Sequence, residues 1–296
     1  MKKNLLFKNN IQKNFLNKSS IKNLSKDYNK IIKEIYLNIN NPRKTLNILN
    51  DKFEFNFKTS DLKKFKKYNS IAFIGMGGSI LGIEAITNFL EKKIKKKIYF
   101  FDNLEPKKIS IFKKNNNLSK ILFLIISKSG NTIETLSNMF ALNIIKKNSK
   151  NVVVITEKKN NILLSLVKKF GIFYIEHKDY IGGRYSIFSE VGLIPAYLVG
   201  LNIFKFRSDI KYFLKGKERN FLKDSAIKLA VLLNSKKIKN LIFINYAPEL
   251  EKFLFWSQQL IAESLGKKGK GFLPTISNAP KDHHSLLQLY LDGPRD

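Results

Sequence analysis

A short turn at 127–132 holds the residues of this sequence that are best suited to bind an anion. It has three hydroxyls, one ammonium and no acidic side chain: Ser127, Lys128, Ser129, Gly130, Asn131 and Thr132. An unbroken apolar run at 121–126 precedes it, as in a parallel strand covered on both faces, and a helix is expected to begin near Thr132. Asn131 and Glu134 have the spacing of a capping box.

The start of that helix would present free backbone N–H groups and a positive dipole end. With the side chains of Ser127, Lys128, Ser129 and Thr132, these groups suit a phosphate dianion. The alternative is an ordinary capped helix start whose polar residues only satisfy the turn. The turn alone leaves both interpretations open.

A second turn, 75–79, follows an apolar strand at 71–74. Gly75 and Gly77 match the opening of the dinucleotide-binding fingerprint, but Ile80 occupies the position of its third glycine. The sequence therefore disfavours a dinucleotide enzyme, and no cofactor is expected. Gly78 and Ser79 instead predict a backbone and a hydroxyl that approach a ligand closely.

Arg184 follows two glycines, which let the backbone turn tightly and aim a guanidinium inward. The alternative is an arginine that ties down an interdomain loop.

Further along, Gln259 and Glu263 share one face of a predicted helix. Glu263 lies in the last turn, where the helix dipole would favour a base with a raised pKa, although two following lysines oppose that shift. The alternative is an ordinary exposed glutamate.

His284 opens a predicted helix at 284–291, and either a site role or a capping or solvent-exposed role is open for it. No metal site is expected, because the chain has no cysteine and its histidines lack the spacing of a zinc motif.

Alternating strands and helices from residue 70 onward must position these groups. Strands are expected at 71–74, 97–101, 121–126, 152–155 and 173–176, and helices at 80–92, 106–114, 132 to about 147 and 162–170. This repeat predicts an α/β fold with a parallel sheet between two helical layers. Both turns then lie at carboxyl ends of strands, where open parallel sheets bind ligands.

A second α/β unit is expected from a helix at 224–234, a strand at 240–244, a helix at 248–265 and a strand at 271–276. The predicted organisation is a helical segment at 1–66, a first domain at 67–200 and a second at 201–296. Ile31, Ile32, Ile35 and Tyr36 give the helical segment one apolar face, and it is expected to pack on the first sheet.

Composition limits the classes of function. The net charge of +31 is spread along the chain and arginine is scarce, which disfavours a dedicated nucleic-acid-binding protein. The apolar window 188–204 is interrupted by Glu190 and Pro195 and favours a buried helix over a membrane span. The run Leu5-Leu6-Phe7 is too short for a signal peptide core. A chain without cysteine fits a cytoplasmic location.

The motifs occur in an order that resembles the glucose-6-phosphate isomerase family. They are FIGMGGSILG, ISKSGNTIET, GGRYS, QQLIAESLGK and HHSLLQLYLDGP, and the likeness covers most of the chain from about Ser70 onward. The resemblance implies two SIS-type three-layer α/β/α domains with parallel sheets and interconversion of glucose 6-phosphate and fructose 6-phosphate. A regulator that binds sugar phosphates without catalysis is the alternative, which the presence of Glu263 and Arg184 disfavours.

The resemblance also implies a substrate-binding set: Gly78, Ser79, Ser127, Lys128, Ser129, Thr132 and Gln259. It implies that Glu263 moves the proton between C1 and C2 and that Arg184 stabilises the enediolate. It further implies that His284 assists ring opening from the neighbouring subunit, which makes the protein a homodimer. The family has another catalytic lysine near its C-terminus that this chain, ending at Asp296, lacks. The second domain is therefore expected to be incomplete.

Overall fold

The computed structural model describes residues 10–11, 13–208, 210 and 218–294. The run Leu5–Phe7 and the end at Asp296 lie outside these residues. The strands are β1 (Ser70–Ile74), β2 (Lys97–Phe101), β3 (Ile121–Ile126), β4 (Val152–Thr156), β5 (Phe173–Glu176), β6 (Asn240–Asn245) and β7 (Leu273–Asn278).

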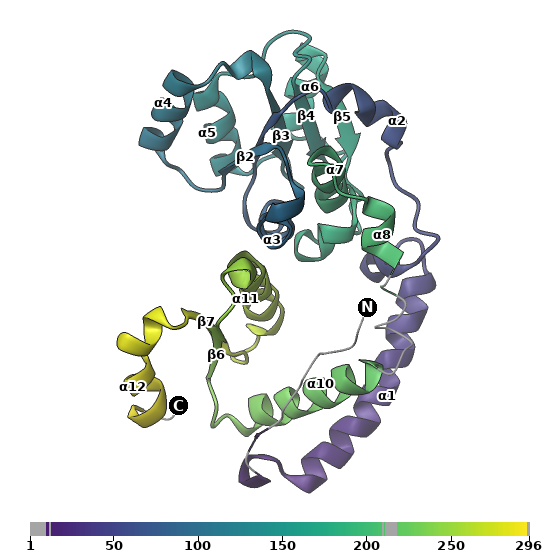
Figure 1. The fold of residues 1–296 in the computed structure, drawn as a ribbon. Coiled ribbons are helices and arrows are strands. Elements are labelled where there is room, and N and C mark those ends of the chain that lie inside the picture. Colours follow the sequence, from purple (N-terminus) through teal and green to yellow (C-terminus); the bar gives the residue numbers. More distant parts are fainter. Residues whose placement is uncertain (1–9, 12, 209, 211–217, 295–296) are drawn as a thin grey trace.

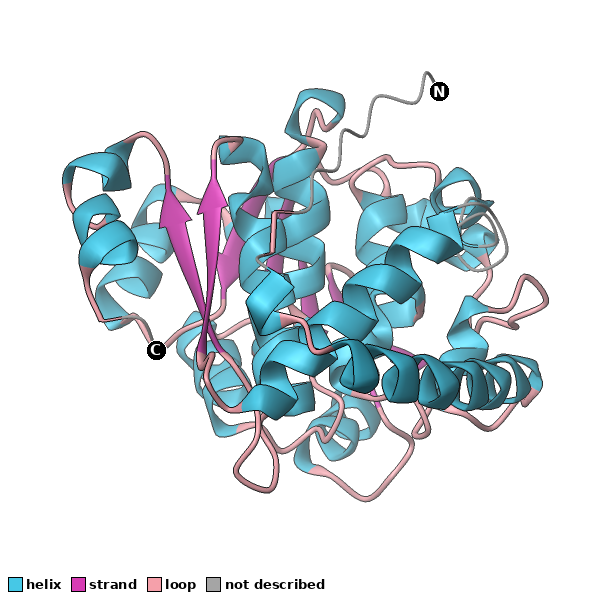
Figure 2. Cartoon of the chain, turned by 90° about the horizontal axis from the view of Figure 1, so that it is seen from below, coloured by secondary structure: helices cyan, strands magenta, loops and turns pink. Residues whose placement is uncertain are grey.

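Helices of different lengths surround these strands (Figures 1 and 2). They are α1 (Lys18–Asn40), α2 (Thr59–Leu62), α3 (Leu81–Phe89), α4 (Pro106–Asn115), α5 (Ile133–Leu142), α6 (Ile162–Phe170), α7 (Glu190–Leu198), α8 (Ile203–Ser208), α10 (Glu218–Ser235), α11 (Glu251–Leu265) and α12 (Leu287–Asp292). The short 3-10 helices are η1 (Lys13–Phe15), η2 (Thr45–Leu49), η3 (Lys63–Phe65), η4 (Gly77–Ser79), η5 (Glu91–Lys93), η6 (Leu118–Lys120), η7 (Gly183–Phe188), η8 (Pro248–Leu250) and η9 (Lys281–His284).

The first sheet has five parallel strands in the order β2-β1-β3-β4-β5. All six residues of β3 are buried, as the unbroken apolar run predicted. Apolar residues of α3 and α7 cover one face of the sheet, and those of α4, α5 and α6 cover the other. The predicted three-layer α/β/α arrangement is thus confirmed for the first sheet.

The chain leaves β1 toward β2 on one side, and later returns to β3 on the other side of β1. The order of the strands therefore reverses between β1 and β3. Connections that diverge at such a point leave a crevice beyond the carboxyl ends of the strands, which is where open α/β sheets bind ligands. The two turns at 75–79 and 127–132 directly follow these two strands.

The second unit contains the parallel pair β6–β7, which α11 connects. The helix α11 packs against α3 of the first unit as well as against β7. Because α3 follows the 75–79 turn and α11 contains Gln259 and Glu263, this contact brings the two predicted groups of site residues together.

The N-terminal helix corrects one expectation. Residues 62–68 do pack beneath the first sheet, where Leu62 and Phe65 are buried. The helix α1, however, lies against α10 and η2 rather than on the sheet (Figure 1). Ile31, predicted on its apolar face, is 52% exposed.

Several predicted element ends also shift. The helix α5 ends at Leu142 instead of near residue 147, because Asn143 takes a left-handed conformation with φ 53°. His284 ends η9 rather than opening a helix, and α12 begins only at Leu287. The window 188–204 contains the buried helix α7, as predicted. Among the described residues, none of the helices combines the length and the apolar composition needed to cross a membrane.

Candidate active site

The turn at 127–132 gathers its three hydroxyls at the start of α5. Ser127 Oγ accepts a hydrogen bond from the backbone N–H of Gly130 at 3.1 Å and lies 3.0 Å from Thr132 Oγ1. Ser129 Oγ is 3.4 Å from the same Thr132 oxygen. A helix start with three converging hydroxyls can donate several hydrogen bonds to an anion such as a phosphate.

The predicted capping box at this turn is not formed. Thr132 occupies the N-cap position of α5, with φ −63° and ψ 114°. Asn131 instead accepts a hydrogen bond at 3.0 Å from the backbone N–H of Ile162, at the start of α6. The side chain that was expected to cap its own helix therefore joins the turn to the next helix of the layer.

Gly130 is required at its position for two reasons. Its φ of +67° lies in the left-handed region, and a Cβ there would lie 2.0 Å from Asn161 Oδ1. Asn161 cannot easily move away, because it is buried and the same oxygen caps α6 by accepting from Leu164 N–H at 2.8 Å.

The ammonium of Lys128 binds protein oxygens. It donates hydrogen bonds to the backbone carbonyls of Asp179 at 2.9 Å and Ile181 at 2.8 Å, and it lies 3.4 Å from a carboxylate oxygen of Glu157. The side chain that was predicted to contact phosphate is thus engaged with the loop that precedes Arg184.

The turn at 75–79 touches the Arg184 loop directly. A Cβ on Gly78 would lie 2.5 Å from both the carbonyl carbon and the oxygen of Gly183. Ser186 Oγ reinforces the contact by donating to Gly183 O at 2.7 Å, and it lies 3.3 Å from Gly78 O. Ser79 ends η4, and its backbone N–H donates to Met76 O at 3.1 Å.

Arg184 and Glu263 face each other across the boundary between the two units. Arg184 Nε lies 3.6 Å from Glu263 Oε1, and Arg184 Nη1 donates to Ser264 Oγ at 3.0 Å. The guanidinium side chain is 18% exposed, whereas that of Glu263 is 56% exposed. Arg184 therefore joins the two units, and it also lies beside Glu263, the residue predicted as the base.

Gln259 orients Glu263 from one turn earlier in α11. Its Nε2 donates to Glu263 Oε2 at 3.2 Å, as the predicted shared helix face requires. Its own Oε1 is buried and has no hydrogen-bond partner among the described residues. Gly77, with φ +52°, brings its backbone close to the same amide, so that a Cβ would lie 3.0 Å from Gln259 Nε2.

Sequence reasoning missed two polar neighbours of Arg184. Ser264 accepts from the guanidinium, and Tyr185 Oη lies 3.3 Å from the same serine hydroxyl. The only available signal was their adjacency to Glu263 and Arg184. Adjacency alone does not show which way a side chain points.

His284 lies in η9, which follows β7. Within the described part of the chain, no hydrogen bond or ion pair joins it to Arg184 or Glu263. Its neighbour His283 instead lies 2.8 Å from Tyr246 Oη. Across the described residues no cluster of three or more potential metal ligands occurs.

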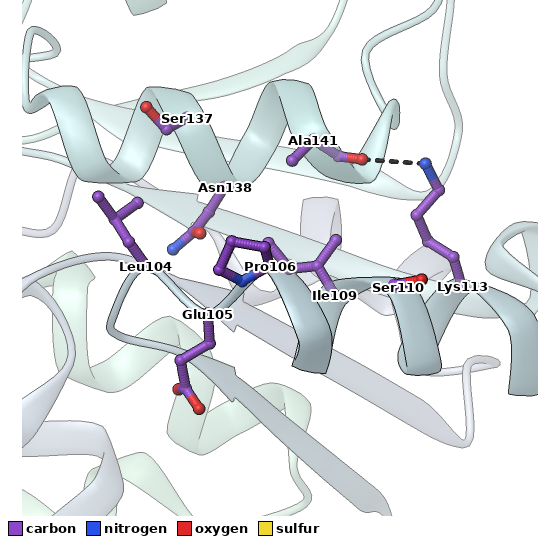
Figure 3. A pocket seen from close by; sticks show the side chains of 9 residues that line it. All are labelled: Leu104, Glu105, Pro106, Ile109, Ser110, Lys113, Ser137, Asn138 and Ala141. Carbon is purple, nitrogen blue, oxygen red and sulfur yellow. Dashed lines mark hydrogen bonds between the residues drawn. The ribbon is translucent and has the colours of Figure 1, made fainter.

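A separate cavity of about 460 Å³ lies between α4 and α5 (Figure 3). None of the residues predicted for the site lines it. Lys113 at its edge donates to Ala141 O at 3.0 Å, and Asn138 donates to Asn103 O at 3.1 Å. Lys113 and Asn138 are thus directed at backbone carbonyls, whereas Glu105 pairs with the side chain of Lys108 at 3.0 Å.

Several known proteins are similar to this chain. The family model described as phosphoglucose isomerase matches residues 38–273. A probable glucose-6-phosphate isomerase of Methanococcus maripaludis is 35% identical over 85% of this chain and 60% of its own length. The glucose-6-phosphate isomerase of Methanocaldococcus jannaschii is 37% identical over 80% of this chain and 61% of its own length. The chain thus spans about 60% of the length of these relatives.

Solved structures share the fold. A hypothetical protein of Thermus thermophilus superposes with a TM-score of 0.71 at 24% identity, covering 95% of this chain and 72% of its own. A glucose-6-phosphate isomerase of Chlamydia trachomatis gives 0.66 at 22% identity, covering 79% of this chain and 49% of its own. The fold of this chain is therefore one that solved proteins adopt.

Proposed function

We propose, because this chain belongs to the phosphoglucose isomerase family, that it interconverts glucose 6-phosphate and fructose 6-phosphate. The observation that supports this function best is the group formed by Arg184, Glu263 and Gln259. Removing a proton next to a carbonyl requires a base to take the proton and a cation to stabilise the negative charge on the oxygen. A protein that only bound the sugar phosphate would not need a base on the carbon face.

In the proposed reaction, the Glu263 carboxylate removes the proton from C2 of the open-chain aldose and returns it to C1. The electron pair of the broken C–H bond forms the C1–C2 double bond, and the carbonyl oxygen O1 takes up the negative charge. A proton then passes from O2 to O1, so that the return of the proton to C1 leaves the carbonyl at C2. Arg184 stabilises this enediolate, and Gln259 holds the carboxylate in the orientation for transfer. None of these steps uses a cofactor or a metal.

The phosphate end of the substrate would bind at the 127–132 turn. The hydroxyls of Ser127, Ser129 and Thr132 and the start of α5 supply neutral donors there. Gly78 and Ser79 would contact the sugar between the phosphate and Arg184. Holding the unreactive end in this way supplies binding energy that positions C1 and C2 against Glu263.

We also propose that the protein is a cytoplasmic homodimer. Among the described residues, no hydrogen bond or ion pair joins His284 to Glu263 of the same chain. The partner subunit's His284 would then assist ring opening at the site of the first chain. A symmetric dimer places such a residue in both sites by the same contact.

The replacement Glu263→Gln tests the proposal. The purified wild-type protein is expected to convert glucose 6-phosphate to fructose 6-phosphate and to exchange the C2 proton with solvent. In the variant both rates should fall about 10³-fold, since general acid–base catalysis contributes roughly 10² to 10⁴. Glu249→Gln, on an exposed residue of η8, is the control and should retain activity. Equal exchange rates in wild type and Glu263→Gln would exclude Glu263 as the base.

A further inference from the structure

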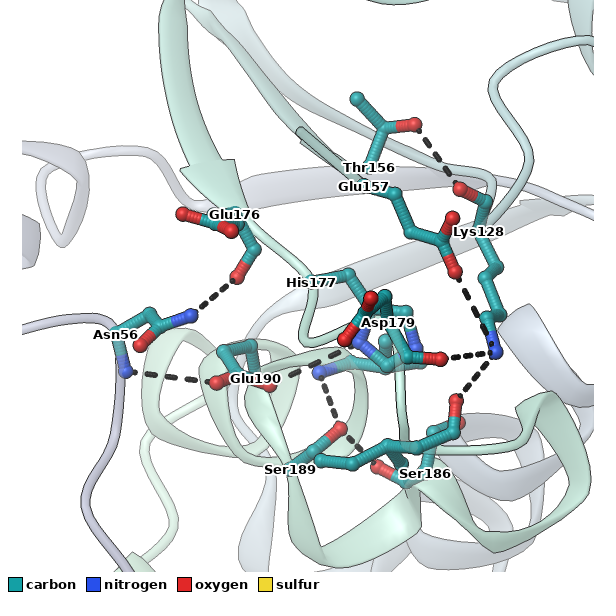
Figure 4. A network of polar contacts seen from close by, with 12 residues as sticks. Asn56, Lys128, Thr156, Glu157, Glu176, His177, Asp179, Ser186, Ser189 and Glu190 are labelled. Carbon is teal, nitrogen blue, oxygen red and sulfur yellow. Dashed lines mark hydrogen bonds and ion pairs between the residues drawn. The ribbon is translucent and has the colours of Figure 1, made fainter. Parts of the chain in front are cut away.

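The side chain of Lys128 meets three oxygens, none of which belongs to its own turn (Figure 4). Two are backbone carbonyls, of Asp179 and Ile181, and the third belongs to Glu157. A lysine ammonium has three N–H donors and no acceptor. These contacts can therefore use its full donor capacity without a ligand.

The Glu157 carboxylate explains why a cation is needed here. This side chain is 8% exposed and pairs with Lys159 at 2.9 Å as well as with Lys128. A largely buried carboxylate is costly unless it is paired. Lys128 thus neutralises a buried charge and satisfies two carbonyls at the same time.

The main chain of Lys128 is fixed as well. Its carbonyl oxygen accepts from Glu157 N–H at 3.1 Å and from Thr156 Oγ1 at 3.3 Å, at the carboxyl end of β4. Lys128 is therefore anchored to the sheet at its backbone and to the 179–181 loop at its side-chain end. If the 179–181 loop shifted relative to the end of β4, Lys128 would have to move with it or lose some of these hydrogen bonds.

The loop that Lys128 holds leads directly to Arg184. Thr45 Oγ1 donates to the intervening carbonyl, of Tyr180, so that three successive carbonyls are fixed by side chains from elsewhere. Ile181 is fully buried. Two residues later the backbone of Gly183 packs against Gly78 so closely that a Cβ on Gly78 would not fit. The position of Arg184 is thus set from both sides.

We infer that the Lys128 side chain is a positioning residue, which holds the 179–183 loop so that Arg184 meets the developing enediolate, and that it does not serve as a phosphate ligand. This inference rests on the proposed function for the role of Arg184. It assigns phosphate contact to the hydroxyls of the turn and to the start of α5. It also couples the phosphate end of the site to the reacting end through one side chain.

Two ligands separate positioning from phosphate binding. Sorbitol 6-phosphate has the phosphate but no charge at C1, whereas 6-phosphogluconate adds a carboxylate there, next to the expected place of Arg184. If Lys128 is a positioning residue, Lys128→Met should bind sorbitol 6-phosphate with the wild-type affinity. Its preference for 6-phosphogluconate over sorbitol 6-phosphate should fall about tenfold, as expected for the loss of one charge-assisted hydrogen bond. Lys128→Arg, which keeps the donors, should restore part of it. Equal losses for both ligands would overturn the inference and make Lys128 a phosphate ligand.

Hydrogen exchange tests the loop without any ligand. The amides of Ile181 and Tyr185 are hydrogen-bonded to Lys178 O and Gly182 O. Their exchange should become faster in Lys128→Met and return toward the wild-type rate in Lys128→Arg. The matched control is Lys96→Met. Lys96 lies just before β2 and, like Lys128, donates hydrogen bonds to two backbone carbonyls, those of Lys66 and Tyr68.

The two measurements separate failure of the inference from failure of the proposed function. Unchanged exchange at 179–185 in Lys128→Met would overturn the inference even in a fully active isomerase. A wild-type protein that binds 6-phosphogluconate no better than sorbitol 6-phosphate would instead count against the proposed role of Arg184. The exchange result would still decide whether Lys128 holds the loop.

Discussion

At the scale of single residues, the site depends on close backbone approaches that only glycine allows. Gly78 and Gly183 come from turns that are about a hundred residues apart in the sequence, and they meet so closely that a methyl group on Gly78 would not fit. The two neighbouring glycines before Arg184 predicted a tight turn. The partner of that turn could not be read from the sequence, because no pattern records which distant backbone will lie against it.

Gly78→Ala is expected to damage catalysis more than stability. The new methyl group would lie 2.5 Å from Gly183, so that the Arg184 loop must shift. A displacement of this kind typically costs about 10²-fold in rate, and kcat should fall by that order while Tm changes by only a few degrees. Gly183→Ala is the informative control, because a Cβ there meets nothing within 4 Å. Similar kcat values for the two variants would contradict this account.

Two hydroxyls of the 127–132 turn should differ in how much they contribute to stability. Ser127 is 3% exposed and accepts from Gly130 N–H, so Ser127→Ala leaves a buried donor unpaired and should cost about 1 to 3 kcal/mol in the free energy of unfolding. Ser129 is exposed, and Ser129→Ala should change stability by under about 0.5 kcal/mol. Both should weaken sugar-phosphate binding in calorimetry, and a variant with unchanged affinity would remove that hydroxyl from the phosphate site.

At the scale of elements, the contact between α3 and α11 determines whether Glu263 reaches Arg184. Its least ordinary component is Glu84 of α3, which is 4% exposed and lies 3.8 Å from Lys252 Nζ of α11. Burial raises the pKa of Glu84 to about 7, the attraction of Lys252 opposes that rise, and Asp102 adds to it. The contact between α3 and α11 thus contains a carboxyl group whose pKa lies near neutrality.

This carboxyl group predicts a pH dependence of stability. Because its pKa is higher in the folded protein than in the unfolded chain, the folded state binds the proton more tightly. The free energy of unfolding should therefore fall as pH rises from about 4.5 to about 7 and level off above. Glu84→Gln should remove about 1 to 3 kcal/mol of that fall in urea titrations, since one pKa unit corresponds to about 1.4 kcal/mol. Glu91→Gln, on an exposed residue, should leave the slope unchanged.

Element boundaries were predictable where local rules decide them. The strand at Phe173–Glu176 and the helix at Ile162–Phe170 lie where the apolar pattern placed them. The predicted end of α5 was wrong, because Asn143 ends the helix by taking a left-handed conformation, which asparagine tolerates but does not require. The cap of α5 was also wrong, because Asn131 had a second backbone donor within reach, at Ile162.

At the scale of the whole molecule, the predicted packing of the N-terminal segment shows the limit of pattern reading. An apolar face predicts that α1 is covered, but the pattern does not identify what covers it. The sheet was the nearest candidate in the sequence, whereas α10, about two hundred residues later, is the partner. Conversely, the resemblance implied that Arg184 and Glu263 serve one site, and the structure does bring these two side chains within 3.6 Å of each other.

The proposed homodimer predicts complementation between inactive chains. Glu263→Gln and His284→Ala should each be inactive alone. When both are expressed together, each mixed dimer should contain one site with both residues intact, so that random pairing restores roughly a quarter of wild-type activity. No recovery, with mixed dimers demonstrated by mass spectrometry, would show that the partner subunit's His284 does not serve the site. The restored sites should have the wild-type KM.

The pairing of α1 with α10 also bears on how the protein is synthesised. The ribosome adds about 5 to 20 residues per second, so roughly 10 to 40 s separate the emergence of α1 from that of its partner. During this interval the first sheet and the contact of α1 with η2 can form, while the part of α1 that packs on α10 is not yet covered. Slow codons between residues 40 and 218 would prolong that exposure, and a chaperone that binds short apolar helices would find α1 available on the nascent chain.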